Sequence, residues 1–199
     1  HEAYLRLQGS APGRAILLGM NPGPWGMGQT GVPFGEVGHV RDWMGLAGEV
    51  KPPNNEHPKR PVQGLSCARS EVSGRRLWGW AKARFNTPEV FFERFAVWNH
   101  CPLAFLEETG RNRTPDKLPV REREPLMRHC DAALAALVEI LEPAIVVGVG
   151  VWAESCAKRV VGDRVPVGRV LHPSPASPAA NRGWAEAASR QMLEQGIWK

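Results

Sequence analysis

Four short apolar runs constrain the fold of this chain more than any other feature of its sequence. They span residues 15–18, 95–98, 144–149 and 167–171, and none of them alternates with polar residues. A strand that is buried on both faces has a continuous apolar run, whereas a half-exposed strand alternates. Helical patterns lie between and after the runs, which favours a parallel sheet with right-handed crossovers. The sequence therefore predicts an α/β fold.

Three helices are predicted from periodicity and end signals. Residues 126–141 keep one apolar face until Pro143, and residues 151–161 form a shorter helix. The last helix is expected to begin near Ser177, a good capping residue, with Pro178 in its first turn. Its shared face would consist of Ala180, Trp184, Ala188 and Met192.

Two stretches lack such patterns. Residues 51–76 are rich in Pro, Asn and Gly, with six Lys or Arg against two Glu, and residues 107–123 carry five basic and four acidic side chains. Long loops inside a compact domain are usually functional or disordered. Two interpretations stay open, namely loops that follow the phosphates of a nucleic acid and solvated excursions of the surface.

Size, charge and cysteine content narrow the class of protein. A chain of 199 residues fits one domain, taken here as 1–199, and its net charge of +5 favours a polyanionic partner such as nucleic acid. The four cysteines form no C-x-x-C pair, so we expect reduced thiols rather than a zinc or iron–sulfur site. Neither a signal peptide nor a membrane-spanning apolar run is found. We therefore expect no membrane association, and a location in the cytoplasm or nucleoid of a bacterium or in the nucleus of a eukaryote.

Polar and aromatic residues follow the ends of three predicted strands. The first run leads into a 17-residue segment with six glycines and three prolines, which holds Asn21 and Phe34. Asn99 follows the second run and His172 the fourth. Ligands of an open parallel sheet bind beyond the carboxyl ends of its strands. The segment lacks the spacing of a P-loop or of a dinucleotide-binding turn, so a differently shaped pocket is expected at this rim.

The stretches GMNPGPWGMGQTGVPFGEV, HPKRPVQGLSCARSEVSG and WNHCPLAF, and an HPSP followed by SP, AN and GW, run from near residue 16 to near residue 184. On these residues the chain resembles the single-strand-selective monofunctional branch of the uracil-DNA glycosylase superfamily. The resemblance implies a three-layer sandwich with a central four-stranded parallel sheet. It also implies a monomer that hydrolyses the N-glycosidic bond of uracil in single- and double-stranded DNA, with no metal and no cofactor. The product would be an abasic site, the first intermediate of base excision repair.

The same resemblance assigns roles to the rim. Phe34 would stack on a base that has left the helix, and Asn99 would read the edge of the pyrimidine. His172 would donate a hydrogen bond to the 2-oxygen of the departing base, and Asn21 would position the attacking water. An amide cannot take a proton near neutral pH, so Asn21 would orient water without acting as a base. His100 is expected to point away from the pocket.

Other residues bear on substrate range and DNA contact. Met20 and Gly23 would leave room beside the 5-position of the base, which makes 5-hydroxymethyluracil and 5-formyluracil expected substrates. Pro173, Ser174, Pro175, Ala176 and Ser177 would enter the duplex and contact DNA. The chain departs from the family pattern twice, with Ala176 where an arginine is expected and Trp25 where a phenylalanine is expected.

No lysine lies in residues 19–35, 98–103 or 172–178, the segments that follow the strands, and Lys51 and Lys59 are in loops. Strand cleavage through a Schiff base is therefore not expected.

Three alternatives remain on sequence alone. A branch of the superfamily with an iron–sulfur cluster is disfavoured by the scattered cysteines. A non-catalytic module that recognises damaged bases is disfavoured by the joint presence of Asn21 and His172. A hydrolase of free deoxynucleosides is the third.

Overall fold

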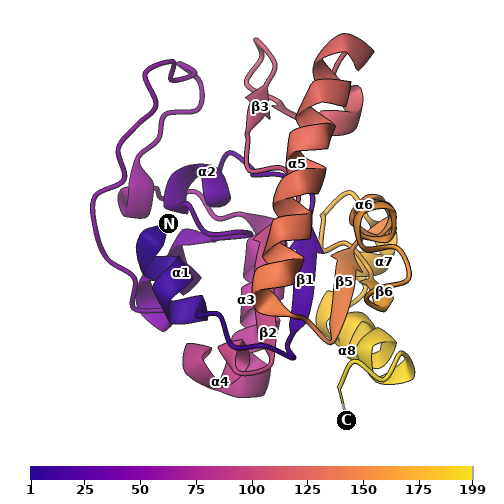
Figure 1. Cartoon of the computed structure of the whole chain (residues 1–199). Coiled ribbons are helices and arrows are strands. Elements are labelled where there is room, and N and C mark those ends of the chain that lie inside the picture. The colour runs from indigo at the N-terminus through magenta and orange to yellow at the C-terminus, as the bar shows by residue number, and fades with distance from the viewer. Residues whose placement is uncertain (199) are drawn as a thin grey trace.

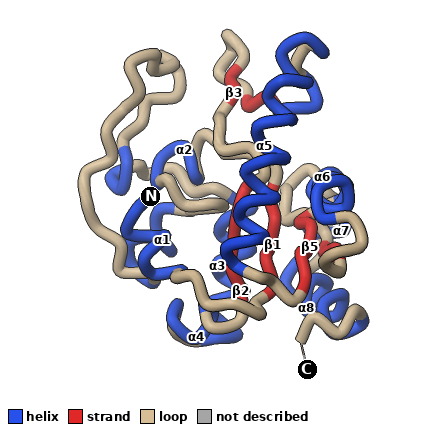
Figure 2. Tube along the Cα trace, in the orientation of Figure 1, coloured by secondary structure: helices blue, strands red, loops and turns tan. Residues whose placement is uncertain are grey.

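The computed structural model describes residues 1–198. Its central sheet consists of β1 (Ala15–Gly19), β2 (Phe95–Asn99), β5 (Ile145–Val149) and β6 (Val167–Val170). The strand order is β2-β1-β5-β6, and all neighbouring strands are parallel. The four apolar runs are thus confirmed as the strands of one parallel sheet. Figure 1 labels these strands, and Figure 2 draws strands in red.

Helices cover both faces of this sheet, so the three-layer α/β prediction is confirmed. Helices α5 (Val120–Leu141) and α6 (Val151–Val161) pack with Ile16 and Leu18 of β1 on one face. On the other face, Leu17 lies in one apolar cluster with residues of α1 (Glu2–Gln8), α3 (Val72–Phe85), α4 (Pro88–Phe92) and α8 (Trp184–Glu194). Figure 1 shows α5 crossing one face while α3 lies behind the sheet. Successive side chains of a strand point to opposite faces, which is why runs such as that of β1 are apolar throughout.

The prediction of one continuous C-terminal helix is wrong. The structure has α7 (Pro178–Asn181), a break at residues 182–183, and then α8. Gly183 adopts φ 124° and ψ 82°, a conformation outside the helical region that glycine tolerates. Ser177 does cap α7, because its Oγ accepts a hydrogen bond from the Ala180 N–H at 3.4 Å. The predicted apolar face survives the break, since all four of its members are buried.

The two irregular stretches contain more regular structure than predicted. Residues 107–123 include part of a hairpin of β3 (Phe105–Leu106) and β4 (Asn112–Arg113), the short helix η3 (Pro115–Lys117), and the start of α5 at Val120. The 51–76 stretch contains η2 (Gly64–Ser66) and the beginning of α3. Helices α1, α3 and α4 were not predicted at all. Their end signals are side chains such as Glu71, which caps α3 by accepting from the N–H groups of Ser73 and Gly74.

The segments that follow the strands gather beyond one end of the sheet. Figure 1 shows α2 (Met27–Thr30), which follows β1, and the β3–β4 hairpin, which follows β2, on this side. The short π-helix η1 (His39–Trp43) continues the β1 segment. All four cysteines are free thiols, as predicted, and all are buried. Within residues 1–198, no helix combines the length and apolar character that crossing a membrane requires.

Candidate active site

A cavity of about 530 Å³ opens beyond the carboxyl ends of β1, β2 and β6. The four residues predicted to form the rim, Asn21, Phe34, Asn99 and His172, all line it. The chain therefore brings together side chains that its sequence places far apart. Of the other predicted site residues, Met20, Gly23, Ser174 and Pro175 also line the cavity.

Asn99 is held at the end of β2 by an extension of the sheet. Gly19 ends β1 opposite Asn99, and the His100 N–H donates to the Gly19 carbonyl at 2.9 Å. The Asn99 amide is buried, and its Nδ2 contacts Met27 Sδ at 3.2 Å. A Cβ on Gly19 would overlap Asn99 Oδ1 and would lie 2.6 Å from Cε2 of Phe34. The absence of a side chain at residue 19 therefore allows the amide and the aromatic ring to meet.

Phe34 has a strained backbone, with φ at 54°. Positive φ is unfavourable for a bulky residue and persists only where the surroundings enforce it. Hydrogen bonds to both neighbours of Phe34 do so here. The Trp78 indole N–H donates to the Pro33 carbonyl at 3.2 Å, and the Thr30 hydroxyl donates to the Gly35 carbonyl at 3.0 Å.

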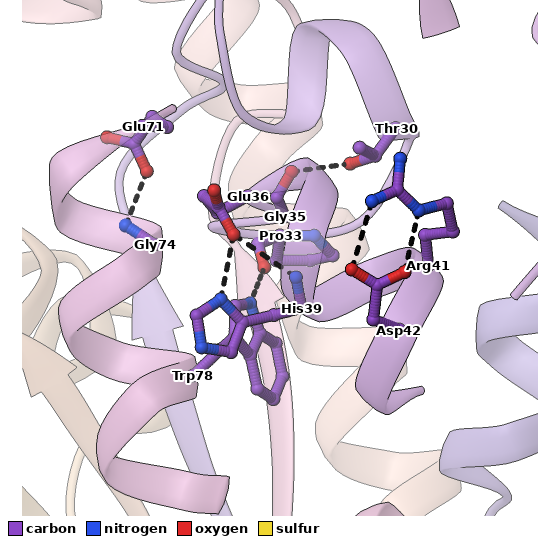
Figure 3. A network of polar contacts seen from close by, with 10 residues as sticks. All are labelled: Thr30, Pro33, Gly35, Glu36, His39, Arg41, Asp42, Glu71, Gly74 and Trp78. Carbon is purple, nitrogen blue, oxygen red and sulfur yellow. Dashed lines mark hydrogen bonds and ion pairs between the residues drawn. The ribbon is translucent and has the colours of Figure 1, made fainter. Parts of the chain in front are cut away.

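A wider polar network joins this turn to α3 (Figure 3). The Glu36 carboxylate accepts from the backbone N–H of His39 at 3.1 Å and pairs with its Nδ1 at 2.8 Å. Gly74, in the first turn of α3, lies against the turn itself, because a Cβ there would overlap the Phe34 carbonyl oxygen. The turn that carries Phe34 is thus fixed by Trp78 and Gly74 of α3 and by Thr30 of α2.

His172 follows β6 and is held in one orientation. Its Nδ1 accepts a hydrogen bond from the Ser174 N–H at 3.1 Å, so the proton of the neutral ring resides on Nε2. Burial lowers the pKa of His172 below its ordinary value, which favours this neutral form. The ring lies 6.3 Å from that of Phe34, centroid to centroid. The cavity therefore has a neutral N–H donor in His172.

The loop after His172 is braced from beneath. The Arg76 guanidinium donates to the carbonyls of Pro173 and Ser174 at 2.9 and 3.3 Å, and the Asn181 side chain donates to the Pro175 carbonyl at 2.9 Å. Pro173 is buried and its side chain supports the loop, and its contact with DNA stays a prediction. Pro175 and Ala176 are exposed, and Ser177 is half-buried with its hydroxyl engaged in capping α7.

Asn21 is half-buried and loosely held. Its Nδ2 reaches the carbonyls of Pro22 and Arg113 only at 3.4 and 3.5 Å. Its Oδ1 accepts no hydrogen bond from any other group in residues 1–198. An amide oxygen that lines a cavity and has no protein partner is an acceptor for water.

Comparison with known proteins agrees with this geometry. The sequence profile of the uracil DNA glycosylase superfamily matches residues 8–195. The single-strand selective monofunctional uracil DNA glycosylase of Bos taurus is 50% identical over 200 residues, which cover 99% of this chain and 74% of that protein. Its counterpart in Rattus norvegicus is also 50% identical, over 99% of this chain and 72% of that protein.

The chain belongs to the uracil-DNA glycosylase superfamily, in its single-strand-selective monofunctional branch. The fold agrees independently. The crystal structure of wild-type Pedobacter heparinus SMUG2 matches with a TM-score of 0.65, over 99% of this chain and 82% of that chain, at 16% sequence identity.

Sequence reasoning missed several residues of this glycosylase cavity, among which Glu71 stands out. Its carboxyl caps α3 and lines the cavity beside Gly23 and Gly26. Burial raises the pKa of Glu71. Glutamate is not among the residue types that usually precede a helix as its cap, so the sequence carried no signal for Glu71. Asn112 and Thr114, from the β3–β4 hairpin, also line the cavity, and nothing in the mixed charges of that stretch indicated it.

His100 points away from the glycosylase cavity, as predicted. It is fully buried, and its Nε2 lies 2.7 Å from Asp131 Oδ1 on α5, which in turn pairs with Arg159 of α6 at 2.7 Å. None of the side chains lining the cavity is a lysine. In the described part of the chain, no group of three or more His, Cys, Asp and Glu is placed to hold a metal ion.

Proposed function

We propose that this chain hydrolyses the N-glycosidic bond of uracil in DNA and leaves an abasic site without cutting the strand. One observation carries the proposal: an aromatic ring, a buried amide, a neutral imidazole and an unpaired amide oxygen surround one cavity. The chain also belongs to the single-strand-selective branch, since it is 50% identical to the Bos taurus protein over 99% of its own length, and this agrees with that chemistry.

Substrate selection rests on Phe34 and Asn99. A base must leave the stack to enter such a cavity, at a cost of a few kcal/mol. Stacking on an aromatic ring returns about 1–3 kcal/mol and does not distinguish bases. The Asn99 amide accepts from the imino N–H of uracil and donates to its 4-oxygen, whereas cytosine presents the reverse pattern. Because Asn99 is buried, a mismatched base would leave polar groups without partners.

Bond cleavage rests on His172 and Asn21. As the bond from the sugar carbon to the base nitrogen breaks, its electron pair leaves with uracil, and the sugar becomes cationic. The Nε2–H of His172 stabilises the negative charge that develops on the 2-oxygen of the base. Water oriented by Asn21 Oδ1 then bonds to the sugar carbon. Its proton passes to solvent or to the departing uracil anion, because the amide cannot take it.

The experiment compares Asn21→Ala and His172→Ala with the unaltered protein on a uracil-containing single-stranded oligonucleotide. Each variant should lower the single-turnover rate more than tenfold, read as alkali-dependent strand breaks, and leave DNA affinity within a few fold. His129→Ala, an exposed histidine on α5, is the matched control and should leave the rate unchanged. A rate equal to that of the unaltered protein in either cavity variant contradicts the assigned role. Binding without any release of uracil would favour the non-catalytic recognition module instead.

We further propose that 5-hydroxymethyluracil is a substrate, because the wall at Gly23 is open and borders the carboxyl group of Glu71. A Cβ at Gly23 would meet nothing nearer than Glu71, with Oε1 at 4.0 Å. Such a site holds water, which a hydroxymethyl group replaces and an apolar methyl group does not. Gly23→Ala narrows this space without a clash in the protein, so it should reduce kcat/KM for 5-hydroxymethyluracil more than for uracil. An equal reduction for both bases contradicts this assignment.

We also propose activity on duplex DNA, with a preference for single strands. The exposed loop tip carries Ala176, whose small side chain fills little of the gap that an extruded base leaves in a duplex. Ala176→Arg should therefore raise the rate on a U·G duplex relative to the rate on a single strand. An unchanged ratio of the two rates would show that this loop does not decide strand preference.

A further inference from the structure

Trp25, which lines the cavity, has two arginine side chains against its ring. The guanidinium carbon of Arg60 lies 5.0 Å from the ring centroid, and that of Arg69 lies 5.2 Å from it. We call these three residues the Trp25 stack. Arg60 and Arg69, which lie at different points of the segment before α3, thus contact the same indole ring.

The Trp25 stack carries positive charge that the protein does not balance. Within residues 1–198, neither arginine forms an ion pair, whereas arginines such as Arg159 and Arg169 do. The Arg60 Nη1 donates only to the carbonyl of Lys59, at 2.7 Å, and its Nε is buried without an acceptor. A contact between a cation and an aromatic ring contributes about 0.5–1 kcal/mol at an exposed site. Two guanidinium groups held near one ring also repel each other, and a bound anion would reduce this repulsion.

The Trp25 stack lies between two neighbouring hollows of the surface. Trp25 lines the catalytic cavity, and Arg60 lines a second hollow of about 790 Å³ beside it. Pro24 and Met27 line both hollows, so this part of the chain forms the ridge between them. The second hollow is bounded by the long loop before η2, which projects beyond the sheet in Figure 1, and both Lys51 and Glu56 line it.

The loop that contains His172 has no lysine or arginine available to a nucleic acid. Residues 172–178 contain neither lysine nor arginine, and Arg76 beneath them is occupied by carbonyl groups. The planar fork of arginine matches the geometry of a phosphate group.

We propose that the Trp25 stack binds a backbone phosphate of the DNA strand next to the extruded nucleotide, and that the second hollow receives the strand beyond it. This inference rests on the proposed function, because it needs a nucleotide in the catalytic cavity.

The first test measures affinity for a uracil-free single-stranded oligonucleotide by fluorescence anisotropy over a range of salt concentrations, so that no catalysis is involved. Arg60→Ala and Arg69→Ala should each raise Kd at least threefold. Removal of one cation that binds a phosphate should also reduce the slope of log affinity against log salt by about 0.7. Arg69→Lys keeps the charge and should retain most of the affinity, while Trp25→Leu removes the platform and should weaken binding.

Arg84 offers a matched control. Its guanidinium carbon lies 4.9 Å from the ring centroid of Trp198, in the aromatic cluster around Phe95, at the opposite end of β2 from Asn99. Arg84→Ala removes the same kind of contact and the same charge, and it should leave both Kd and the salt slope unchanged. Equal effects of Arg84→Ala and Arg69→Ala would overturn the proposal, because they would show a response to net charge alone. So would a loss of affinity with an unchanged salt slope.

A second test locates the phosphate. A single neutral methylphosphonate linkage is moved stepwise along a uracil-containing strand, and kcat/KM is measured for the unaltered protein and for Arg60→Ala/Arg69→Ala. One position near the uracil should lower the value for the unaltered protein and not for the double variant. Equal sensitivity of the two proteins at every position rejects the site. Release of the oligonucleotide by millimolar inorganic phosphate, at constant ionic strength, would show a site for free phosphate and would also overturn the proposal. If the protein released no uracil at all, the proposed function would fail, while the affinity test would still decide whether the stack binds a strand.

Discussion

At the scale of single residues, the site depends on whether neighbouring groups fix the hydrogen bonding and the charge of each side chain. The Ser174 N–H restrains the tautomer of His172, and burial disfavours its charged form. Asn21 shows the opposite condition, since its oxygen has no protein partner within the described residues and stays available to water. One residue is thus fixed as a donor, and the other is left open as an acceptor.

The restraint on His172 predicts a pH dependence. Neutral His172 is the proposed active form, and burial lowers its pKa below the ordinary 6.5. The single-turnover rate should therefore stay constant as the pH falls through 6.5 and decline only at lower pH. In the unfolded chain His172 has its ordinary pKa, so it takes up a proton at a higher pH than in the folded protein. The free energy of unfolding should therefore decrease as the pH falls below 6.5. A rate profile between pH 4.5 and 8 checks the first statement, and urea unfolding checks the second.

Glu71 is the other cavity group whose pKa could produce such an acidic limb, since burial raises it. Glu71→Gln keeps a capping oxygen for α3 and removes the titration, so it should leave the profile in place. A limb centred above pH 6.5, or one that disappears in Glu71→Gln, contradicts the assignment to His172.

At the scale of elements, the strained turn of Phe34 and helix α3 form one unit. A residue at positive φ costs about 1–3 kcal/mol, which the contacts of the turn with Trp78 and Gly74 offset. Residue 74 of this helix is a glycine because the backbone of the turn occupies the space that a side chain would need.

Two glycines of α3 test this unit. Alanine in place of a helical glycine normally stabilises a protein by about 0.5–1 kcal/mol. Gly79→Ala should do so, because its Cβ would meet only His39 Nε2, at 3.7 Å. Gly74→Ala should instead lower both the melting temperature and the rate of uracil release, because its Cβ overlaps the Phe34 carbonyl. Urea unfolding and single-turnover assays of both variants check this, and equal behaviour would show that the turn does not depend on Gly74.

At the scale of the whole molecule, the two ends of the sheet have different tasks. The carboxyl ends bear the cavity, while an aromatic cluster packs around the start of β2. In that cluster Trp198 stacks on Trp80 at 5.3 Å with an interplanar angle of 5°, and Phe85 and Phe95 meet Trp198 edge-on. The residues that form the cavity and the aromatic residues that stabilise the fold therefore lie at opposite ends of the sheet.

Trp198→Ala should reveal that separation. Removal of a buried aromatic side chain typically costs about 3–5 kcal/mol, because it leaves a cavity that the core fills only in part. Trp198→Phe keeps a ring in the cluster and should cost less. Urea unfolding should rank the variants in that order, and under folding conditions both should release uracil at the unaltered rate. A rate that falls in proportion to stability would argue against separate tasks for the two ends.

The sequence alone was enough to predict some elements and not others, for identifiable reasons. Strands such as β5 are covered on both faces, so their apolar runs are visible without knowledge of the neighbours. Helix α3 was missed because its buried residues include Ser73 and Gly74 as well as Trp78, and a mixed surface of that kind shows little apolar periodicity. One continuous last helix is predicted because its apolar face is continuous, whereas the chain breaks at residues 182–183, where Gly183 leaves the helical conformation.

By itself, the sequence determined the parallel sheet, the rim at its carboxyl ends and the four side chains that meet there, because parallel strands bring their ends to one edge. Only the tertiary structure decided the strained turn of Phe34, the tautomer of His172, the carboxyl of Glu71 in the cavity wall, and the pairing of Arg60 and Arg69 on Trp25. These features arise from contacts between segments that are distant along the chain, and such contacts leave no period or local composition in the sequence.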